Sequence, residues 1–108
     1  VEVDEDQHSQ YDNNCELSRM FNIFQAEGMR CVFIRYNPDV FRIKGRVVRV
    51  RKEKRLEKLD EVAREFISKI PEESLSVYRL FYNNDTGKYC EKYDIEGKYR
   101  DMIFKLNI

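Results

Sequence analysis

Hydrophobic positions along the chain recur with different periods, and each change of period predicts a new element. Residues 1–4 alternate apolar and acidic side chains, a period of two that predicts a short strand. Over residues 15–27, apolar side chains recur at i, i+3, i+4 and i+7, which predicts a helix that ends near Gly28 as its C-cap. Residues 30–36 are β-branched and aromatic and precede an Asn-Pro-Asp turn sequence, so they predict a buried strand.

The second half of the chain predicts one long helix between shorter extended segments. Residues 52–70 carry an apolar stripe at helical spacing and stop before a proline, which predicts a helix of that length. Residues 42–51 alternate basic and apolar side chains less regularly and indicate a β-ribbon. Residues 75–82 predict a strand, residues 88–95 its hairpin partner, and residues 99–108 a last strand.

Together these segments predict an α/β fold with a βαβ unit at its centre. The two strands of such a unit are parallel, because the crossover helix returns the chain to the end of the sheet at which the first strand began. A chain of 108 residues is long enough for one modest core, so we expect one domain. A hydrophobic content of 42%, with seven Phe and seven Tyr, excludes the class of disordered proteins.

The absence of targeting signals and the pattern of cysteines predict the cellular compartment of the protein. No stretch approaches the roughly 18 apolar residues of a membrane span, and no signal-peptide pattern is present. Cys15, Cys31 and Cys90 are odd in number and lack metal-ligand spacing, so they predict neither a disulfide framework nor a zinc site. We therefore expect reduced thiols, an intracellular setting and no membrane association.

The formal net charge of zero conceals a segregation of charge along the chain. Residues 1–28 are acidic, with Arg19 as their one basic residue, whereas residues 29–58 are strongly basic. An acidic segment followed by a basic one suits the binding of a cation and a phosphate together.

Glu2 and Asp4 are the first candidates for chemistry. Carboxylates at i and i+2 of a strand project from the same face, and leaving both ionised and unpaired is costly. A divalent cation, Mg²⁺ or Mn²⁺, removes that cost and can activate a water beside a scissile phosphate. The alternative is an exposed edge strand whose acids are merely solvated. His8 follows the strand and can serve as a general base or as a surface hydrogen-bonding residue.

Basic residues supply the candidate phosphate contacts. The run from Arg42 to Arg55 has Tyr36 and Phe41 nearby as stacking partners, although a solvated ribbon and helix start explain it equally well. Arg35 stands in an otherwise apolar strand, and a buried arginine needs a partner. That partner is Glu2, Asp4 or the substrate backbone. The expected nucleic-acid-binding residues are Arg19, Arg35, Arg42, Lys44, Arg46, Arg49 and Arg51.

Three segments in this order resemble a known family. They are Val-Glu-Val-Asp-Glu-Asp-Gln-His at residues 1–8, Cys-Glu-Leu-Ser-Arg at 15–19, and Val-Phe-Ile-Arg-Tyr-Asn-Pro-Asp at 32–39. As a set they resemble the PD-(D/E)XK restriction-endonuclease-like superfamily, in its branch around very-short-patch repair endonucleases and nuclease-like proteins of large double-stranded DNA viruses.

The resemblance implies a restriction-endonuclease-like core and a metal-dependent phosphodiesterase site. It places Glu2 and Asp4 on the site strand, and His8 as an accessory group where other branches use Lys. Asp4 departs from the pattern, since it stands where the superfamily motif ends in Lys. The family's first metal-binding Asp lies on an earlier strand that these 108 residues do not contain, so we expect an N-terminally truncated domain that is inactive as given.

The sequence thus favours a Mg²⁺-dependent endonuclease-like domain that hydrolyses phosphodiester bonds of DNA. The alternative is a protein that keeps the nuclease fold without its chemistry and acts in nucleic-acid binding or as a viral structural or effector component. A protein-interaction module built on Tyr82, Tyr89, Tyr93 and Tyr99 ranks last, because aromatic-rich hairpins usually belong to a core or its rim.

Overall fold

The protein, seen in a computed structural model, is described at residues 1–8, 13–73 and 75–93, with the backbone alone at residues 8 and 13–17. Two helices separate its groups of strands and pack with them, which confirms the predicted α/β class. In chain order the elements are β1 (Glu2–Val3), the 3-10 turn η1 (Glu5–His8), α1 (Asn13–Glu27), β2 (Cys31–Tyr36), β3 (Phe41–Ile43), β4 (Arg46–Val48), α2 (Lys52–Ser68), β5 (Leu75–Leu80) and β6 (Cys90–Tyr93).

Four strands form one mixed sheet in the order β1-β2-β5-β6. As predicted for the βαβ unit, β1 and β2 are parallel, and β5 lies parallel to β2 on its other side. The predicted hairpin is also confirmed, since β6 pairs antiparallel with β5. The register places Glu2 beside Arg35 and Arg35 beside Arg79, so polar side chains of three strands line up across the sheet.

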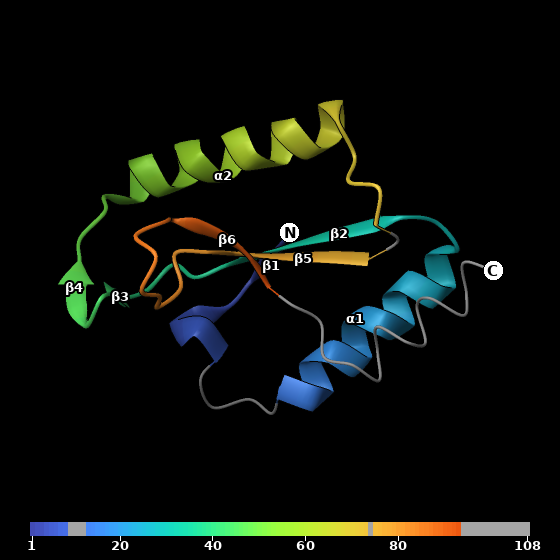
Figure 1. Ribbon diagram of the computed structural model, residues 1–108, viewed down its shortest axis with the longest axis horizontal. Coiled ribbons are helices and arrows are strands. Elements are labelled where there is room, and N and C mark those ends of the chain that lie inside the picture. The colour runs from blue at the N-terminus through green and yellow to red at the C-terminus, as the bar shows by residue number, and fades with distance from the viewer. Residues whose placement is uncertain (9–12, 74, 94–108) are drawn as a thin grey trace.

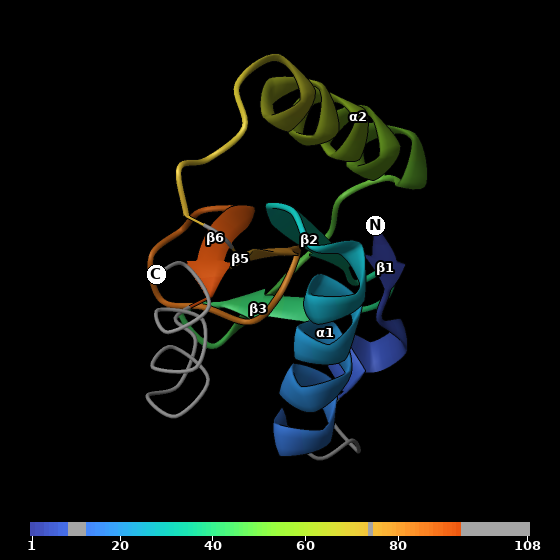
Figure 2. The ribbon, with the colours of Figure 1, turned by 90° about the vertical axis from the view of Figure 1, so that its right-hand side faces the viewer.

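The two helices cover opposite faces of the sheet (Figures 1 and 2). On one face, Met20 of α1 packs in a cluster with Phe33 of β2 and Val77 of β5. On the other face, Val62 of α2 packs in a second cluster with Ile34 of β2. Each central strand therefore contributes alternate side chains to two cores, which explains why residues 30–36 are apolar with little interruption.

The connections that follow β1 and β2 leave the sheet toward opposite faces. β1 leads to α1, and β2 leads through β3 and β4 to α2, while both crossovers step in the same direction across the sheet. The two crossovers therefore have opposite hands, although right-handed crossovers are strongly preferred in proteins. Diverging connections at the carboxyl ends of neighbouring strands mark the place where α/β sheets commonly bind ligands.

β3 and β4 form the antiparallel ribbon that the sequence indicated for residues 42–51. Its two-residue turn is Lys44-Gly45, with positive φ values of 53° and 77°, a turn whose twist matches that of the flanking strands. The ribbon is attached to the loop after β5. There the N–H of Lys44 donates to the carbonyl of Asn84 at 2.9 Å, and the N–H of Asn84 donates to the carbonyl of Arg42 at 3.0 Å.

Both helices differ in one boundary from the sequence prediction. α1 begins at Asn13 instead of residue 15, and α2 ends at Ser68 instead of residue 70, because Lys69 already has extended backbone. Residues 5–8 form the 3-10 turn η1, an element that the sequence did not predict. The last predicted strand, residues 99–108, lies outside the described residues.

Candidate functional site

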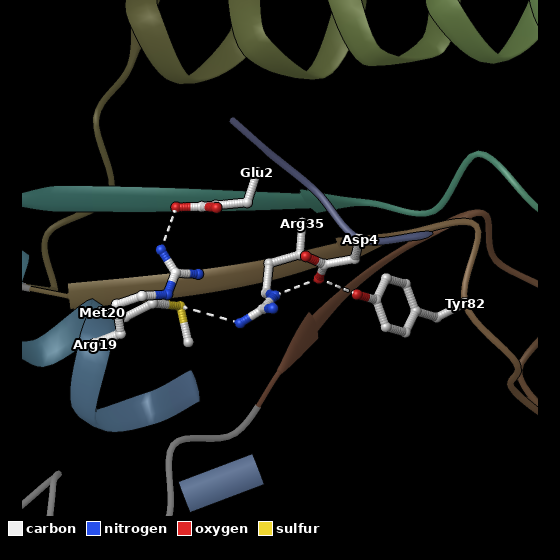
Figure 3. A network of polar contacts seen from close by, with 6 residues as sticks. All are labelled: Glu2, Asp4, Arg19, Met20, Arg35 and Tyr82. Atoms are coloured by element: carbon white, nitrogen blue, oxygen red, sulfur yellow. Dashed lines mark hydrogen bonds and ion pairs between the residues drawn. The ribbon is translucent and has the colours of Figure 1, made fainter. Parts of the chain in front are cut away.

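Asp4 and Arg35 form a buried ion pair near the carboxyl ends of β1 and β2 (Figure 3). Asp4 is 0% exposed and Arg35 is 4% exposed. The Nε of Arg35 donates to Oδ2 of Asp4, and its Nη1 lies 3.7 Å from the sulfur of Met20 in α1. Because a charge buried without a partner costs several kcal/mol, each member of the pair depends on the other. The pair therefore fastens the short strand β1 to the centre of the sheet.

Tyr82 completes this network from the far side of β2. It follows β5, and its hydroxyl donates to the same Oδ2 of Asp4. Burial, and secondly the hydrogen bond to Asp4, raise the pKa of the Tyr82 phenol, so the hydroxyl keeps its proton. The guanidinium of Arg79 lies 5.0 Å from the Tyr82 ring centre and 3.9 Å from that of Tyr93. The network thus connects all four strands of the sheet.

Glu2 lies on the same side of β1 as Asp4 but remains partly in solvent. Its carboxylate accepts a hydrogen bond from Arg19 of α1 at 2.8 Å, and the two side chains are 28% and 43% exposed. The period of two in residues 1–4 is confirmed, with both acids turned toward α1 while Val1 and Val3 are exposed. This orientation follows from the arginines, which offer the acids partners on the inner face.

Glu2 and Asp4 do not by themselves form a magnesium site. Mg²⁺ prefers carboxylates that leave room for several bound waters. Asp4 is fully buried, and its Oδ2 is engaged by Arg35 and Tyr82. In the part of the chain that the structure describes, no group of three or more His, Cys, Asp or Glu side chains is placed to hold a metal ion. Of the two acids, Glu2 is the one with an accessible carboxylate.

The turn η1 is fastened to the connection that leads into the ribbon. Asp6 and Gln7 have positive φ values of 49° and 58°, which residues other than glycine rarely adopt. The side-chain amide of Gln7 accepts from the N–H of Asn83 at 2.8 Å and donates to Oδ1 of Asn83 at 3.1 Å. That Oδ1 also accepts the N–H of Arg42 at 2.7 Å, and Oδ2 of Asp39 accepts the N–H of Asp6 at 2.7 Å.

A separate group of basic side chains lies on the ribbon and the start of α2, which we call the basic ribbon (residues 42–54). Glu53 is the one acidic residue in this stretch, and Lys54 pairs with Glu57 at 3.4 Å. The remaining basic side chains are exposed and form no ion pair with a carboxylate of the described residues. They are Arg42, Lys44, Arg46, Arg49, Arg51 and Lys52.

Arg55, the last residue of the run expected to contact phosphates, points inward instead. Its Nη1 donates to the carbonyls of Asn37 at 3.0 Å and Asp39 at 2.8 Å. Its guanidinium lies 5.2 Å from the ring centres of both Phe41 and Phe81. A buried arginine with carbonyl and aromatic partners has a structural role, so Arg55 holds the start of α2 against the β2–β3 connection.

The structure brings four of the predicted site residues together and places five others elsewhere. Glu2, Asp4, Arg19 and Arg35 belong to the network of Figure 3, and of the three partners left open for Arg35 the structure shows Asp4. Because Arg35 is buried and paired, it does not face a phosphate. The side chain of His8 lies outside the described part of the chain. The residues that lie apart, on the basic ribbon, are Arg42, Lys44, Arg46, Arg49 and Arg51.

Sequence reasoning missed Tyr82, Gln7 and Asn83. Tyr82 was expected only in an interaction module, although its place at the carboxyl end of the predicted strand 75–82 could have put it near Asp4, which ends the first strand. Gln7 and Asn83 had none, because their contact joins residues 76 positions apart along the chain.

Comparisons with protein-family models, with curated proteins and with solved structures gave no match. Within the described residues, neither helix combines the length and apolar character needed to cross a membrane.

Proposed function

We propose that this chain binds nucleic acid, and DNA in particular, by holding the phosphate backbone on the basic ribbon. The observation that carries the proposal is the set of six exposed cationic side chains, from Arg42 to Lys52, that lack a carboxylate partner among the described residues. A charge that is not neutralised within the protein can neutralise a phosphate and release the counterions condensed on the nucleic acid.

The contacts that hold the backbone of the ribbon in place also support the proposal. Its turn is a tight two-residue turn, its backbone is hydrogen-bonded to Asn84, and Arg55 fixes the segment behind it. A rigid backbone lowers the entropy that the ribbon loses when it binds a ligand. A two-stranded antiparallel ribbon is also narrow enough to enter the major groove of B-DNA, which is about 12 Å wide.

Fluorescence anisotropy with a labelled 20-base-pair DNA tests the proposal directly. The double variant Arg42→Gln/Arg46→Gln removes two charges from the ribbon, and we expect its Kd to rise at least about tenfold at moderate salt. The matched control Arg30→Gln/Lys69→Gln also removes two exposed charges, but before β2 and after α2, and we expect it to bind almost as the parent does. An equal loss in both double variants would contradict a ribbon site.

Metal-dependent phosphodiester hydrolysis is the second candidate function. It is favoured by the position of Glu2 and Asp4 at an edge strand whose following turn is hydrogen-bonded to the basic ribbon. In that case the fold is restriction-endonuclease-like, and Mg²⁺ or Mn²⁺ needs acidic ligands beyond Glu2 and Asp4. Incubation of the full-length protein with supercoiled plasmid and either metal tests it, with Glu2→Gln and His8→Ala as variants. Equal nicking by parent and Glu2→Gln protein would exclude Glu2 from the reaction.

A further inference from the structure

A hollow of about 630 Å³ is lined by residues 47–51 of the basic ribbon, by Arg55 of α2 and by the β2–β3 connection. This volume lies within the roughly 300–1,000 Å³ of sites that hold small molecules. Part of its wall is apolar and consists of Pro38, Val40, Val47, Val48 and Val50. Val40 and Val47 are exposed and line the hollow together with three other apolar residues, so this wall offers an apolar surface to a ligand.

The charged part of the wall defines the chemistry of the ligand. Arg49 and Arg51 line the hollow, are exposed, and lack an ion-pair partner among the described residues. Two arginines separated by one residue suit the oxygens of a phosphate, because guanidinium groups bind phosphate through paired hydrogen bonds. Arg55 also lines the hollow, but its guanidinium is already engaged by backbone carbonyls.

Asp39 adds a second polar feature to the same hollow. Its Oδ2 accepts the N–H of Asp6, and its carboxylate can accept a further hydrogen bond from a ligand hydroxyl. A carboxylate also limits the negative charge that the site tolerates, since it repels additional phosphates. Arginines, an apolar wall and one acid together match a ligand with one phosphate, an apolar ring and sugar hydroxyls.

We propose that this hollow binds a nucleoside monophosphate unit, either as a free nucleotide or as the terminal nucleotide of a strand. The phosphate lies on Arg49 and Arg51, the base lies against Val40 and Val47, and a sugar hydroxyl donates to Asp39. This inference rests on the proposed function, because the strand whose end enters the hollow is the one whose backbone lies on the basic ribbon.

Isothermal titration calorimetry of the intact protein with adenosine 5′-monophosphate tests the hollow itself. We expect binding that is at least about tenfold tighter than that of inorganic phosphate or of adenosine alone, and about tenfold weaker in Arg51→Gln. The matched control is Arg30→Gln, which removes the same charge from an exposed site outside both the hollow and the basic ribbon and leaves this binding unchanged. Phosphate binding as tight as that of the nucleotide, or an equal loss in both variants, would overturn the proposal.

A competition experiment distinguishes the two sources of the ligand. A single-stranded oligonucleotide with a free 3′-hydroxyl that displaces the nucleotide, where its 3′-phosphorylated counterpart does not, supports the 3′ end of a strand, because only the free hydroxyl can donate to Asp39. Displacement by neither oligonucleotide supports a free nucleotide. The anisotropy assay on duplex DNA reports separately on the basic ribbon. If the protein binds duplex DNA but no nucleotide, only the proposal for the hollow is overturned. If it binds no duplex DNA at any salt concentration, the proposed function is overturned.

Discussion

Asp4 and Glu2 are two residues apart on the same strand, yet each meets its arginine in a different environment. The pair of Asp4 with Arg35 is buried, whereas the pair of Glu2 with Arg19 is exposed to solvent. Exposed ion pairs contribute about 0–1 kcal/mol, because water screens them. Removing one partner of a buried pair costs about 3–5 kcal/mol, because the other charge stays buried.

Replacement of each arginine by methionine tests this difference. We expect Arg35→Met to lower the free energy of unfolding by about 3–5 kcal/mol. Arg19→Met, the matched control on the exposed pair, should lower it by less than about 1 kcal/mol. Urea unfolding followed by circular dichroism measures both. Similar losses in the two variants would mean that the Asp4–Arg35 pair is not the buried anchor of β1.

Tyr82 predicts a dependence of stability on alkaline pH. Its pKa is raised above the ordinary value of 10.0, so the unfolded chain releases the phenolic proton at a lower pH than the folded chain does. Above about pH 10 the folded protein therefore loses stability, by at most about 1.4 kcal/mol per pH unit from this group. Tyr82→Phe should be less stable at neutral pH by about 1–3 kcal/mol, because Asp4 loses a donor.

The difference in unfolding free energy between parent and Tyr82→Phe, measured from pH 8 to pH 11, isolates this contribution. We expect the difference to stay constant up to about pH 10 and then to shrink. Two parallel curves over that range would show that Tyr82 titrates at its ordinary pKa.

At the scale of elements, β1 and η1 are held in place by side chains more than by backbone pairing. β1 is a strand of two residues, and η1 contains two residues at positive φ. Gln7 offsets the short backbone pairing of this segment, since its amide forms hydrogen bonds with both the backbone and the side chain of Asn83. The side chain of Asn83 in turn accepts the N–H of Arg42 in the ribbon. The acidic edge strand and the basic ribbon are thereby joined.

Gln7→Ala should loosen this junction while the helices stay intact. We expect the amide of Asn83, which Gln7 protects, to exchange with solvent at least about tenfold faster, and the protein to lose about 1–2 kcal/mol of stability. Hydrogen exchange followed by NMR measures both effects. Gln25→Ala on the exposed side of α1 is the control and should leave Asn83 unchanged. Unchanged exchange at Asn83 in Gln7→Ala would show that the turn is held by other contacts.

Most of the regular elements could be predicted from the sequence, because period and turn residues are local signals. The apolar stripe ending at Gly28 gave α1, and Gly28 has a φ of 66° as its C-cap role requires. The ribbon was indicated less clearly, since its strands are three residues each. The opposite hands of the crossovers could not be predicted, because the general preference is for right-handed connections.

The candidate site was predictable only in part. The position of Arg35 within an apolar strand correctly predicted that it has a partner, but left open whether that partner is Glu2, Asp4 or a substrate backbone. Whether Arg35 pairs with Asp4 or with Glu2 depends on which carboxylate is buried under α1. Burial of this kind is a tertiary property and cannot be predicted from the spacing of the acids. The spacing of the acids predicted a shared face, but the burial of Asp4 and its hydrogen bond from Tyr82 come from residues 78 positions apart.

At the scale of the whole molecule, a net charge of zero combines an acidic amino-terminal part with a basic ribbon. The acids Glu2 and Asp4 face α1 and are paired with arginines, so they do not neutralise the ribbon. A locally uncompensated field, not the net charge, therefore determines what the molecule attracts. This field predicts binding of a polyanion that weakens steeply as salt is added.

The most direct test is the salt dependence of DNA binding by the parent and the Arg42→Gln/Arg46→Gln variant. A plot of log K against log salt concentration has a slope of about −0.9 per phosphate neutralised on duplex DNA. If the basic ribbon holds the backbone, the slope in the variant is shallower by about two, and the Arg30→Gln/Lys69→Gln control keeps the parent slope. Identical slopes in all three proteins would show that the basic ribbon does not hold the DNA backbone.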